Sequence, residues 1–308
     1  MTNKQTTVLV SPLSRLPLIL QDNRLITNDG KESFSVEQGI ELLLDRSSAD
    51  DTLNQEMKVF DNLNVRGLSY FRPLLYQKMI KLLCNHLKKT GVELKAGLRF
   101  AELGGGEGHC ARYILKNFEQ AEVFVCDASM STLKYAPHSL RRIWADITKP
   151  IFAPKTLQTA AFWVSLHHLN EKQRSLAIEE AFIALEEGGV LIVFEPNDAF
   201  ILRRLLYISP LRHDVYFDDR EEAVSLTKIE ALAKEIGFEP LETIYLNPPY
   251  NPSFVRQLKR SYLYLPIVES LHVLSFMLSG IYTRKHIKYM RHLSLYGMSF
   301  FRKPYRSL

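Results

Sequence analysis

A glycine-rich turn after a short apolar segment is the clearest place for chemistry in this chain. Residues 98–103 read Leu-Arg-Phe-Ala-Glu-Leu, and Glu102 is the acid near the end of that segment. The glycines of the turn are Gly104, Gly105, Gly106 and Gly108. Glycine lets the backbone approach a ligand closely, and the N–H groups at a helix start point toward it. The pattern predicts a strand, a tight turn and a helix around a nucleotide-like ligand.

Two further acids follow apolar segments and are candidates for the same ligand. Asp127 ends the segment 121–127, nineteen residues after Gly108, and Asp146 follows the segment 141–145. An acid after the second strand of such a fold can accept hydrogen bonds from both ribose hydroxyl groups. A dinucleotide site would have GxGxxG, but His109 occupies the place of the third glycine.

Four side chains could remove a proton from an acceptor: His167, His168, His213 and Glu195. Histidine is the usual general base near neutral pH. Each candidate also has a structural interpretation. One of the adjacent histidines could simply pack, Glu195 could cap the following helix, and His213 could be a surface residue in a loop.

These residues need elements that bring them to one place. Apolar segments at 98–103, 121–130, 141–150, 159–170 and 187–198 predict strands, and 171–186 has a helical pattern. Alternation of strands and helices predicts an α/β fold with a doubly wound parallel sheet. Ligands of such sheets bind beyond the carboxyl ends of the strands, where Gly104, Asp127, Asp146, Ser165 and Glu195 fall.

The pattern ExGxGxG at 102–108 is similar to the signature of class I S-adenosylmethionine-dependent methyltransferases, and the later segments follow in that family's order over 60–245. The resemblance implies a Rossmann-like, seven-stranded sheet and S-adenosylmethionine as cofactor. It implies cofactor contacts from Glu102, Gly104, Gly105, Gly106, Gly108, Asp127, Ala128, Ser129, Met130, Asp146, Ile147 and Ser165. The chain departs from the family at Leu157-Gln158, where a Phe-Asp pair is usual. The alternative is a doubly wound domain for another ligand.

Residues 1–50 resemble the small zinc-ribbon segment, related to the tRNA-methyltransferase activator family, that precedes many methyltransferase domains. The resemblance rests on LVSPLSRLPL (9–18) and the stretch 25–44. The four ligand positions hold Ser11, Ser14, Thr27 and Gly30, which cannot supply the donors that zinc needs. We therefore expect a metal-free β-ribbon appendage held by apolar packing on the larger domain. The alternative is a polar leader with a coincidental pattern.

A methyltransferase domain is expected over 60–308, with a long insertion at 253–291 between its last two strands, 240–246 and 292–304. The middle of the insertion is apolar and aromatic, and Lys and Arg flank it. Three interpretations stay open: a helical cap over an apolar acceptor pocket, a peripheral membrane contact, or a homodimer surface. We favour the cap, with membrane contact as a consequence of the same surface.

The motif Asn-Pro-Pro-Tyr at 247–250 holds the target amine in nucleic-acid amino-methyltransferases, where it follows the fourth strand. Here it comes some eighty residues after the fourth strand. We interpret it as a rigid turn that stops the sixth strand.

Charge and cysteine content indicate the kind of partner and the cellular compartment. Residues 256–308 hold ten Lys or Arg and one acid, so this end is basic and the remainder is net acidic. A basic end suggests an anionic partner, although a solvated helix face is equally compatible. Three cysteines without a CxxC pair, and no N-terminal signal pattern, favour a cytoplasmic protein.

The sequence therefore predicts S-adenosylmethionine-dependent methyl transfer to the N, O or C atom of a small hydrophobic acceptor or a specialised metabolite. Two alternatives stay open. The basic end and the relatives of the ribbon favour a tRNA or protein methyltransferase, although nucleic acid is the less expected partner. A non-catalytic partner subunit would keep the fold, but the complete glycine turn with Asp127 and Asp146 argues against it.

Overall fold

The computed structural model describes residues 8–44, 53–54, 57, 81, 83–85, 97–118, 120–201, 224–246, 290–292, 294 and 296–305. The strands are β1 (Leu18–Gln21), β2 (Arg24–Thr27), β3 (Ser33–Glu37), β4 (Ile40–Leu42), β5 (Arg99–Leu103), β6 (Glu122–Asp127), β7 (Arg141–Trp144), β8 (Leu157–Trp163), β9 (Leu185–Pro196), β10 (Glu239–Leu246) and β11 (Tyr296–Arg302). The α-helices are α3 (His109–Asn117), α4 (Met130–Leu133), α5 (Glu171–Ala184) and α7 (Leu226–Ile236), and the short 3-10 helices are η2 (Leu166–His168) and η4 (Met290–His292).

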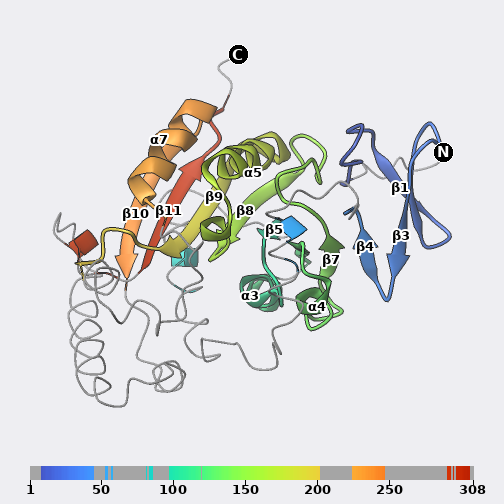
Figure 1. Ribbon diagram of the computed structural model, residues 1–308, viewed down its shortest axis with the longest axis horizontal. Helices are drawn as coiled ribbons and strands as arrows, with labels where there is room; N and C mark the ends of the chain where they lie inside the picture. Colours follow the sequence, from blue (N-terminus) through green and yellow to red (C-terminus); the bar gives the residue numbers. More distant parts are fainter. Residues whose placement is uncertain are drawn as a thin grey trace.

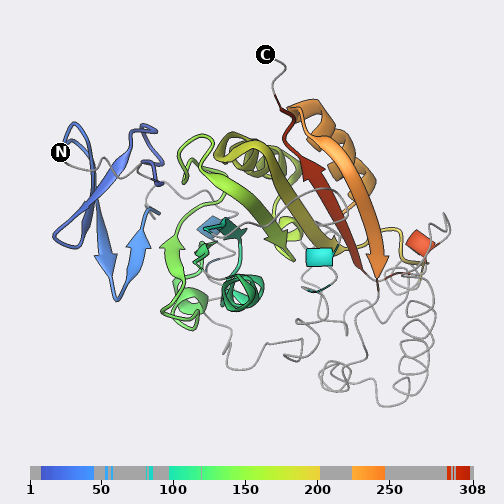
Figure 2. The same ribbon diagram turned by 180° about the vertical axis from the view of Figure 1, so that it is seen from behind.

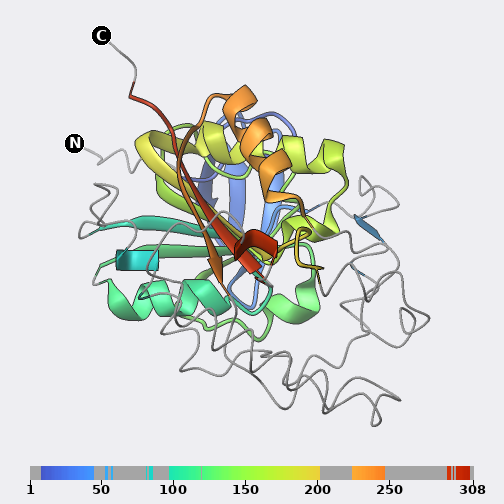
Figure 3. The ribbon, with the colours of Figure 1, turned by 90° about the vertical axis from the view of Figure 1, so that its left-hand side faces the viewer.

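Seven strands form the central part of one sheet, in the order β7-β6-β5-β8-β9-β11-β10. The first five are parallel, whereas β11 runs antiparallel to both β9 and β10. Figure 2 shows the arrowheads of β8, β9 and β10 at one edge and that of β11 at the other. Helices α5 and α7 cover one face, and α3 and α4 cover the opposite face (Figure 1, Figure 3). The predicted Rossmann-like, doubly wound sheet is confirmed.

The central strands are apolar on both faces because helices cover both sides of the sheet. Six of the seven residues of β8 are buried, and Phe100, Phe162 and Phe194 have no exposed surface. A capping box of Asn170 and Gln173 starts α5. This helix ends at Ala184, two residues before the predicted end at 186, because Leu185 already pairs with Leu157 of β8.

The N-terminal strands continue the central sheet. Strands β1 to β4 form an antiparallel meander, and β4 then pairs in parallel with β7 (Figure 1). Leu9, Leu25 and Leu43 are buried in the same core cluster as Ile143 and Phe152 of the central domain. The segment 8–44 is therefore ordered and packed on the larger domain, but as added strands of one sheet and not as a separate ribbon.

Two of the four positions that correspond to zinc ligands, Ser11 and Thr27, form hydrogen bonds with Glu32 through their side chains. The Ser11 hydroxyl oxygen accepts from Leu13 N at 3.0 Å, and the Ser11 hydroxyl group donates to the Glu32 carboxylate. Thr27 Oγ1 accepts from Glu32 N at 3.1 Å. Glu32 thus connects the first turn with the second.

Gly30 N donates to Thr27 O at 2.8 Å, and Ser14 N donates to Ser11 Oγ at 3.2 Å. Within the described ranges, His, Cys, Asp and Glu side chains do not gather in threes that could hold a metal. The likeness of this segment to a zinc ribbon stays a prediction.

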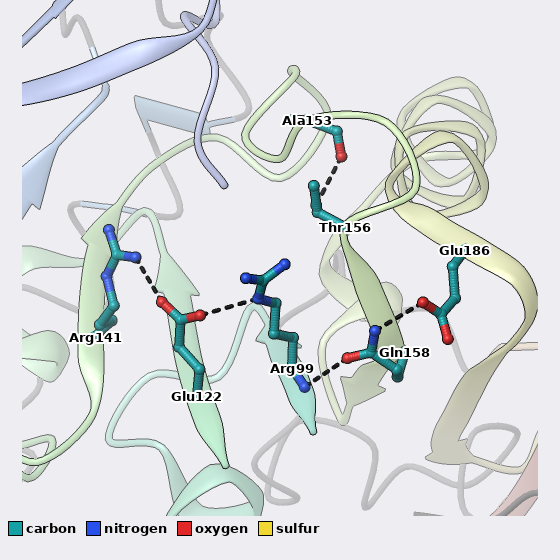
Figure 4. A network of polar contacts seen from close by, with 7 residues as sticks. All are labelled: Arg99, Glu122, Arg141, Ala153, Thr156, Gln158 and Glu186. Carbon is teal, nitrogen blue, oxygen red and sulfur yellow. Dashed lines mark hydrogen bonds and ion pairs between the residues drawn. The ribbon is translucent and has the colours of Figure 1, made fainter. Parts of the chain in front are cut away.

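A polar network crosses the sheet at the amino-terminal edge of the parallel strands (Figure 4). Glu122 of β6 bonds Arg141 of β7 at 2.9 Å and Arg99 of β5 at 3.1 Å. Gln158 of β8 accepts from the backbone N–H of Arg99 at 2.7 Å and donates to Glu186 at 2.8 Å. This edge is the one opposite to the glycine turn, so the network is structural.

Several predictions lie outside the described residues: the linker 45–55 apart from Leu53 and Asn54, most of the helix expected at 71–89, the turn after β10, and nearly all of the insertion 253–291. Among the helices that the structure describes, none is long and apolar enough to cross a membrane.

Candidate functional site

The glycine turn is folded tightly against the ends of β5 and β8. Gly104 and Gly106 have φ angles of +70° and +52°, a region that favours glycine. A Cβ atom at Gly104 would lie 2.6 Å from Ser165 Cβ, and one at Gly105 would lie 2.7 Å from Glu102 Cγ. At Gly104 and Gly105 the turn therefore has room for glycine only, and it brings its backbone to the carboxyl edge of the sheet.

Glu102 is buried beneath the turn, where it holds the start of α3. Its carboxylate accepts from the backbone N–H of Ala111 at 2.6 Å and of Cys110 at 3.3 Å. Burial raises the pKa of Glu102 to about 8, while these two N–H groups oppose the rise. The structure thus gives this motif acid the role of positioning the glycine turn and the helix.

Asp127 connects the end of β6 with the glycine turn. One carboxylate oxygen accepts from Gly106 N at 2.7 Å, and the other accepts from Ser129 N at 2.7 Å. Ser129 is the N-cap of α4, whose first residue is Met130, and its hydroxyl group accepts from Thr132 N. The residues predicted to contact the ribose and the adenine are thereby held as one unit beside the turn.

The loops after β7 and β8 approach the same glycine. Asp146 Oδ1 accepts from Thr148 N at 2.9 Å and from the Thr148 hydroxyl at 2.7 Å, which closes a local turn. The side chain of Ile147 would lie 3.5 Å from a Cβ atom at Gly104, and Ser165 Oγ donates to Leu103 O at 2.9 Å. The sheet therefore brings Gly104, Ile147 and Ser165 together, as the sequence predicts.

The site has the features that an adenosine-containing cofactor needs. The turn offers closely approachable backbone at a helix start, and the Asp127 carboxylate is oriented beside it by Gly106 and Ser129. Residues 100–189 match the family model described as "Methyltransferase domain". The central sheet is the seven-stranded, doubly wound sheet that was predicted from the sequence.

The chain contains a class I S-adenosylmethionine-dependent methyltransferase domain. Its cofactor is S-adenosylmethionine, which supplies an electrophilic methyl group when bound. The residues predicted from the sequence to hold it are Glu102, the glycine turn, Asp127 to Met130, Asp146, Ile147 and Ser165.

Several solved structures are similar to this chain at low sequence identity. The cyclase SpnF is 16% identical, with a TM-score of 0.49 and coverage of 74% of this chain and 81% of SpnF. Phosphoethanolamine N-methyltransferase 2 of Haemonchus contortus is also 16% identical, with a TM-score of 0.47. That match covers 73% of this chain and 53% of the other. No curated protein matches this methyltransferase in sequence.

The turn after β8 has a strained backbone in the methyltransferase. Val164 has a φ angle of +58°, which is rare for a β-branched residue, and its N–H donates to Phe194 O at 2.7 Å. Glu195 Oε1 accepts from Ser165 N at 2.8 Å and from Leu166 N at 2.6 Å. Glu195 therefore holds this turn in place, because its two backbone partners are the N-cap residue Ser165 and the first residue of η2, Leu166.

Glu195 also contacts one of the two adjacent histidines. Its Oε2 lies 2.9 Å from His167 Nδ1, and both side chains are buried. The ring centroid of His168 lies 3.9 Å from that of His167. Burial raises the pKa of Glu195 to about 7, against the opposing N–H groups of Ser165 and Leu166. The pair can keep a proton on Nδ1 of His167 and so fix the ring's orientation.

His213 lies outside the described residues, so the structure does not place the fourth candidate. Two supporting residues were not predicted from the sequence. Arg174 of α5 donates through Nε to Leu166 O at 2.8 Å, and Asn197 donates to Ser294 O at 2.8 Å. Both side chains are buried. Asn197 could have been noticed in the sequence, because it is a polar residue directly after a strand, at the edge where ligands are expected. Arg174 resembled an ordinary helix residue.

Proposed function

We propose that this methyltransferase transfers the methyl group of S-adenosylmethionine to a small, hydrophobic acceptor such as a specialised metabolite. The observation that carries the proposal is the place from which the long insertion departs. The chain leaves β10 at Leu246 and returns in β11 at Tyr296, and these two residues pair. Tyr296 also pairs with Pro196, next to Glu195 at the carboxyl edge of β9.

The two strands that flank the insertion in sequence therefore meet beside the edge that carries the catalytic candidates. Its sequence is mostly apolar and aromatic between 262 and 281. An apolar segment attached at this edge is well placed to supply an apolar acceptor pocket. Peripheral membrane contact and homodimer formation through 253–291, and a cytoplasmic location, are secondary parts of the proposal.

His167 is the base that we propose for acceptors that must lose a proton. The hydrogen bond between Glu195 and Nδ1 would leave the other ring nitrogen, Nε2, to accept the proton. His168 and His213 are the alternative bases, and an acceptor that is already nucleophilic needs none of them. The other residues of the site act by orienting the methyl donor in line with the acceptor.

Mass spectrometry tests the acceptor class. Cell extract is incubated with the enzyme and S-adenosylmethionine that carries an isotopically labelled methyl group. A labelled small metabolite is the expected product. Label in RNA or protein would refute the small-molecule proposal while leaving the methyltransferase assignment intact. An Asp127→Ala enzyme serves as the control for background methylation by other enzymes in the extract.

A tRNA or protein acceptor is the second candidate, because residues 256–308 are strongly basic. This candidate predicts RNA binding that weakens steeply as salt increases. Fluorescence anisotropy with total tRNA at two salt concentrations measures it. We expect negligible binding at both, and tight, salt-sensitive binding would favour the second candidate.

A further inference from the structure

Trp144 lies between the N-terminal strands and the loop that follows β6. It is the last residue of β7 and is 8% exposed. Its side chain belongs to the buried cluster that contains Ile40 of β4 and Leu133 of α4, and Ala128 and Met130 pack against that cluster. Two parts of the chain that are far apart in sequence thus meet at one ring.

The backbone of Trp144 is held by residues of the N-terminal segment. Leu42 pairs with Trp144 in the parallel register of β4 and β7. The N–H groups of Leu43 and Leu44 both donate to Trp144 O, each at 2.9 Å. The position of this residue therefore depends on strands that lie outside the central seven.

The indole of Trp144 holds the loop on its other side. Its Nε1–H donates to Ala128 O at 2.7 Å. Asp127 is the register partner of Trp144, and Asp127 O accepts from Ala145 N at 3.0 Å. Two successive carbonyl groups, those of Asp127 and Ala128, are consequently directed toward β7 and its continuation.

The direction of these two carbonyl groups determines which groups the loop presents to the glycine turn. With both carbonyls engaged by β7, the Ser129 N–H and the Asp127 carboxylate face each other and the glycine turn, where Gly106 N completes the arrangement. These are the groups expected to meet the ribose and the adenine. A change in the direction of the Ala128 carbonyl would disturb them.

We propose that Trp144 is a positioning residue for S-adenosylmethionine, and that residues 40–44 act through it, so that the N-terminal strands contribute to cofactor affinity. Trp144 touches the loop and not the reacting atoms. Its effect is on the shape of the site before the cofactor arrives.

The test is Trp144→Phe, which keeps an aromatic ring but removes the indole N–H. Loss of one buried hydrogen bond corresponds to roughly a three- to tenfold increase in Kd for S-adenosylmethionine and S-adenosylhomocysteine, measured by calorimetry. The KM for the cofactor should rise by the same factor, with kcat at saturating cofactor unchanged. An unchanged Kd would overturn the proposal.

The matched control is Trp163→Phe, since Trp163 is the other tryptophan and is the last residue of β8, another strand of the central sheet. It is 5% exposed and packs on Phe194 with ring centroids 4.5 Å apart. The Ala128 carbonyl keeps its bond from the Trp144 indole in this variant, so the Kd of Trp163→Phe should stay within about twofold of wild type. Equal weakening by both variants would attribute the effect to general loosening and reject the specific role.

A second measurement uses the wild-type protein and does not depend on either variant folding. If the N-terminal strands and the cofactor site are coupled, S-adenosylhomocysteine must stabilise the strands in return. Hydrogen–deuterium exchange of peptides that cover 40–44 should slow when it is added. Exchange in these peptides that does not respond to the ligand would refute the role of the N-terminal strands.

Discussion

Glu102 and Glu195 are two buried carboxylates whose bonds go to different parts of the site. Glu102 accepts from the first N–H groups of α3, and Glu195 accepts from the turn after β8. Both are neutralised more easily than an exposed glutamate, because burial raises the pKa of each. Each therefore holds a ligand-binding backbone segment from beneath, and only Glu195 also contacts a candidate base.

The pKa of Glu102 makes stability depend on pH. Its folded-state pKa of about 8 lies above the ordinary value of 4.5. The folded state binds this proton more tightly than the unfolded state does. The resulting stabilisation is fully present below pH 4.5 and is lost as the pH rises toward 8. Glu102→Gln removes that titration. Between pH 5 and pH 8, the free energy of unfolding of the variant, measured with urea, should rise relative to that of the wild type by on the order of 2 kcal/mol. A constant difference across that range would contradict the expectation.

Asp127 is the residue whose loss should affect the cofactor most directly. Asp127→Ala removes the acceptors for Gly106 and Ser129 together with the expected ribose contacts. Calorimetry should show cofactor binding weaker by about 1–3 kcal/mol. Glu171→Ala is the control, because Glu171 forms an exposed ion pair with Lys228 on the surface. Wild-type affinity in the Asp127 variant would refute the assignment of the ribose site.

At the scale of elements, hydrogen bonds and apolar packing hold the N-terminal strands. Ser11 and Thr27 are buried and are both bonded to Glu32, so the two turns are joined without thiolates. Leu9, Leu18 and Leu25 are at most 3% exposed. A segment of this length gains enough buried surface only by joining a larger core.

Ser11→Ala tests the hydrogen bonds between the two turns. The variant leaves Leu13 N–H and Glu32 without their partner, so the free energy of unfolding should fall by about 1–2 kcal/mol. Ser14→Ala is the matched control at an exposed serine of the same turn, with an expected change below about 0.5 kcal/mol. Equal effects would show that the buried serine has no special role.

Metal analysis gives an independent check on the same strands. Serine, threonine and glycine offer none of the usual zinc donors at the four corresponding positions. We expect no stoichiometric zinc in the purified protein, and no change in Tm when a chelator is added. One zinc ion per chain, lost together with stability on chelation, would reverse this interpretation.

At the scale of the whole molecule, one sheet of eleven strands joins segments from both ends of the chain. Strand β7 would be the edge of the central sheet without β4, which covers it. An exposed, flat edge next to apolar residues such as Ile143 is prone to pair with other chains. Continuity of the sheet therefore protects the fold as well as supporting Trp144.

Deletion of residues 1–44 should consequently yield protein that aggregates, as size-exclusion chromatography would show. The deletion exposes the β7 edge and the core surfaces of Ile143 and Phe152. Deletion of residues 1–7 is the control, since the described backbone hydrogen bonds begin at Val8, whose carbonyl oxygen accepts from Ala153 N, and this variant should elute like the full chain. A well-behaved, folded 45–308 fragment would show that the N-terminal strands are dispensable.

The sequence by itself determined the local units of the site. The strand with its glycine turn, Asp127 nineteen residues after Gly108, and the order of later strands depend on short-range spacing and polarity, which the chain carries directly. That information was sufficient for the Rossmann-like sheet and for which residues share its carboxyl edge, because parallel strands put equivalent ends together.

Only the tertiary structure decided which of those side chains meet. Glu195 and His167 are far apart in sequence, and a carboxylate that follows a strand can equally cap the next helix. Trp144 resembled an ordinary apolar strand residue until its indole was found at 2.7 Å from Ala128 O. The parallel pairing of β4 with β7 was also not predictable, because a pattern of alternating residues records which face is buried and not which strand lies beside it.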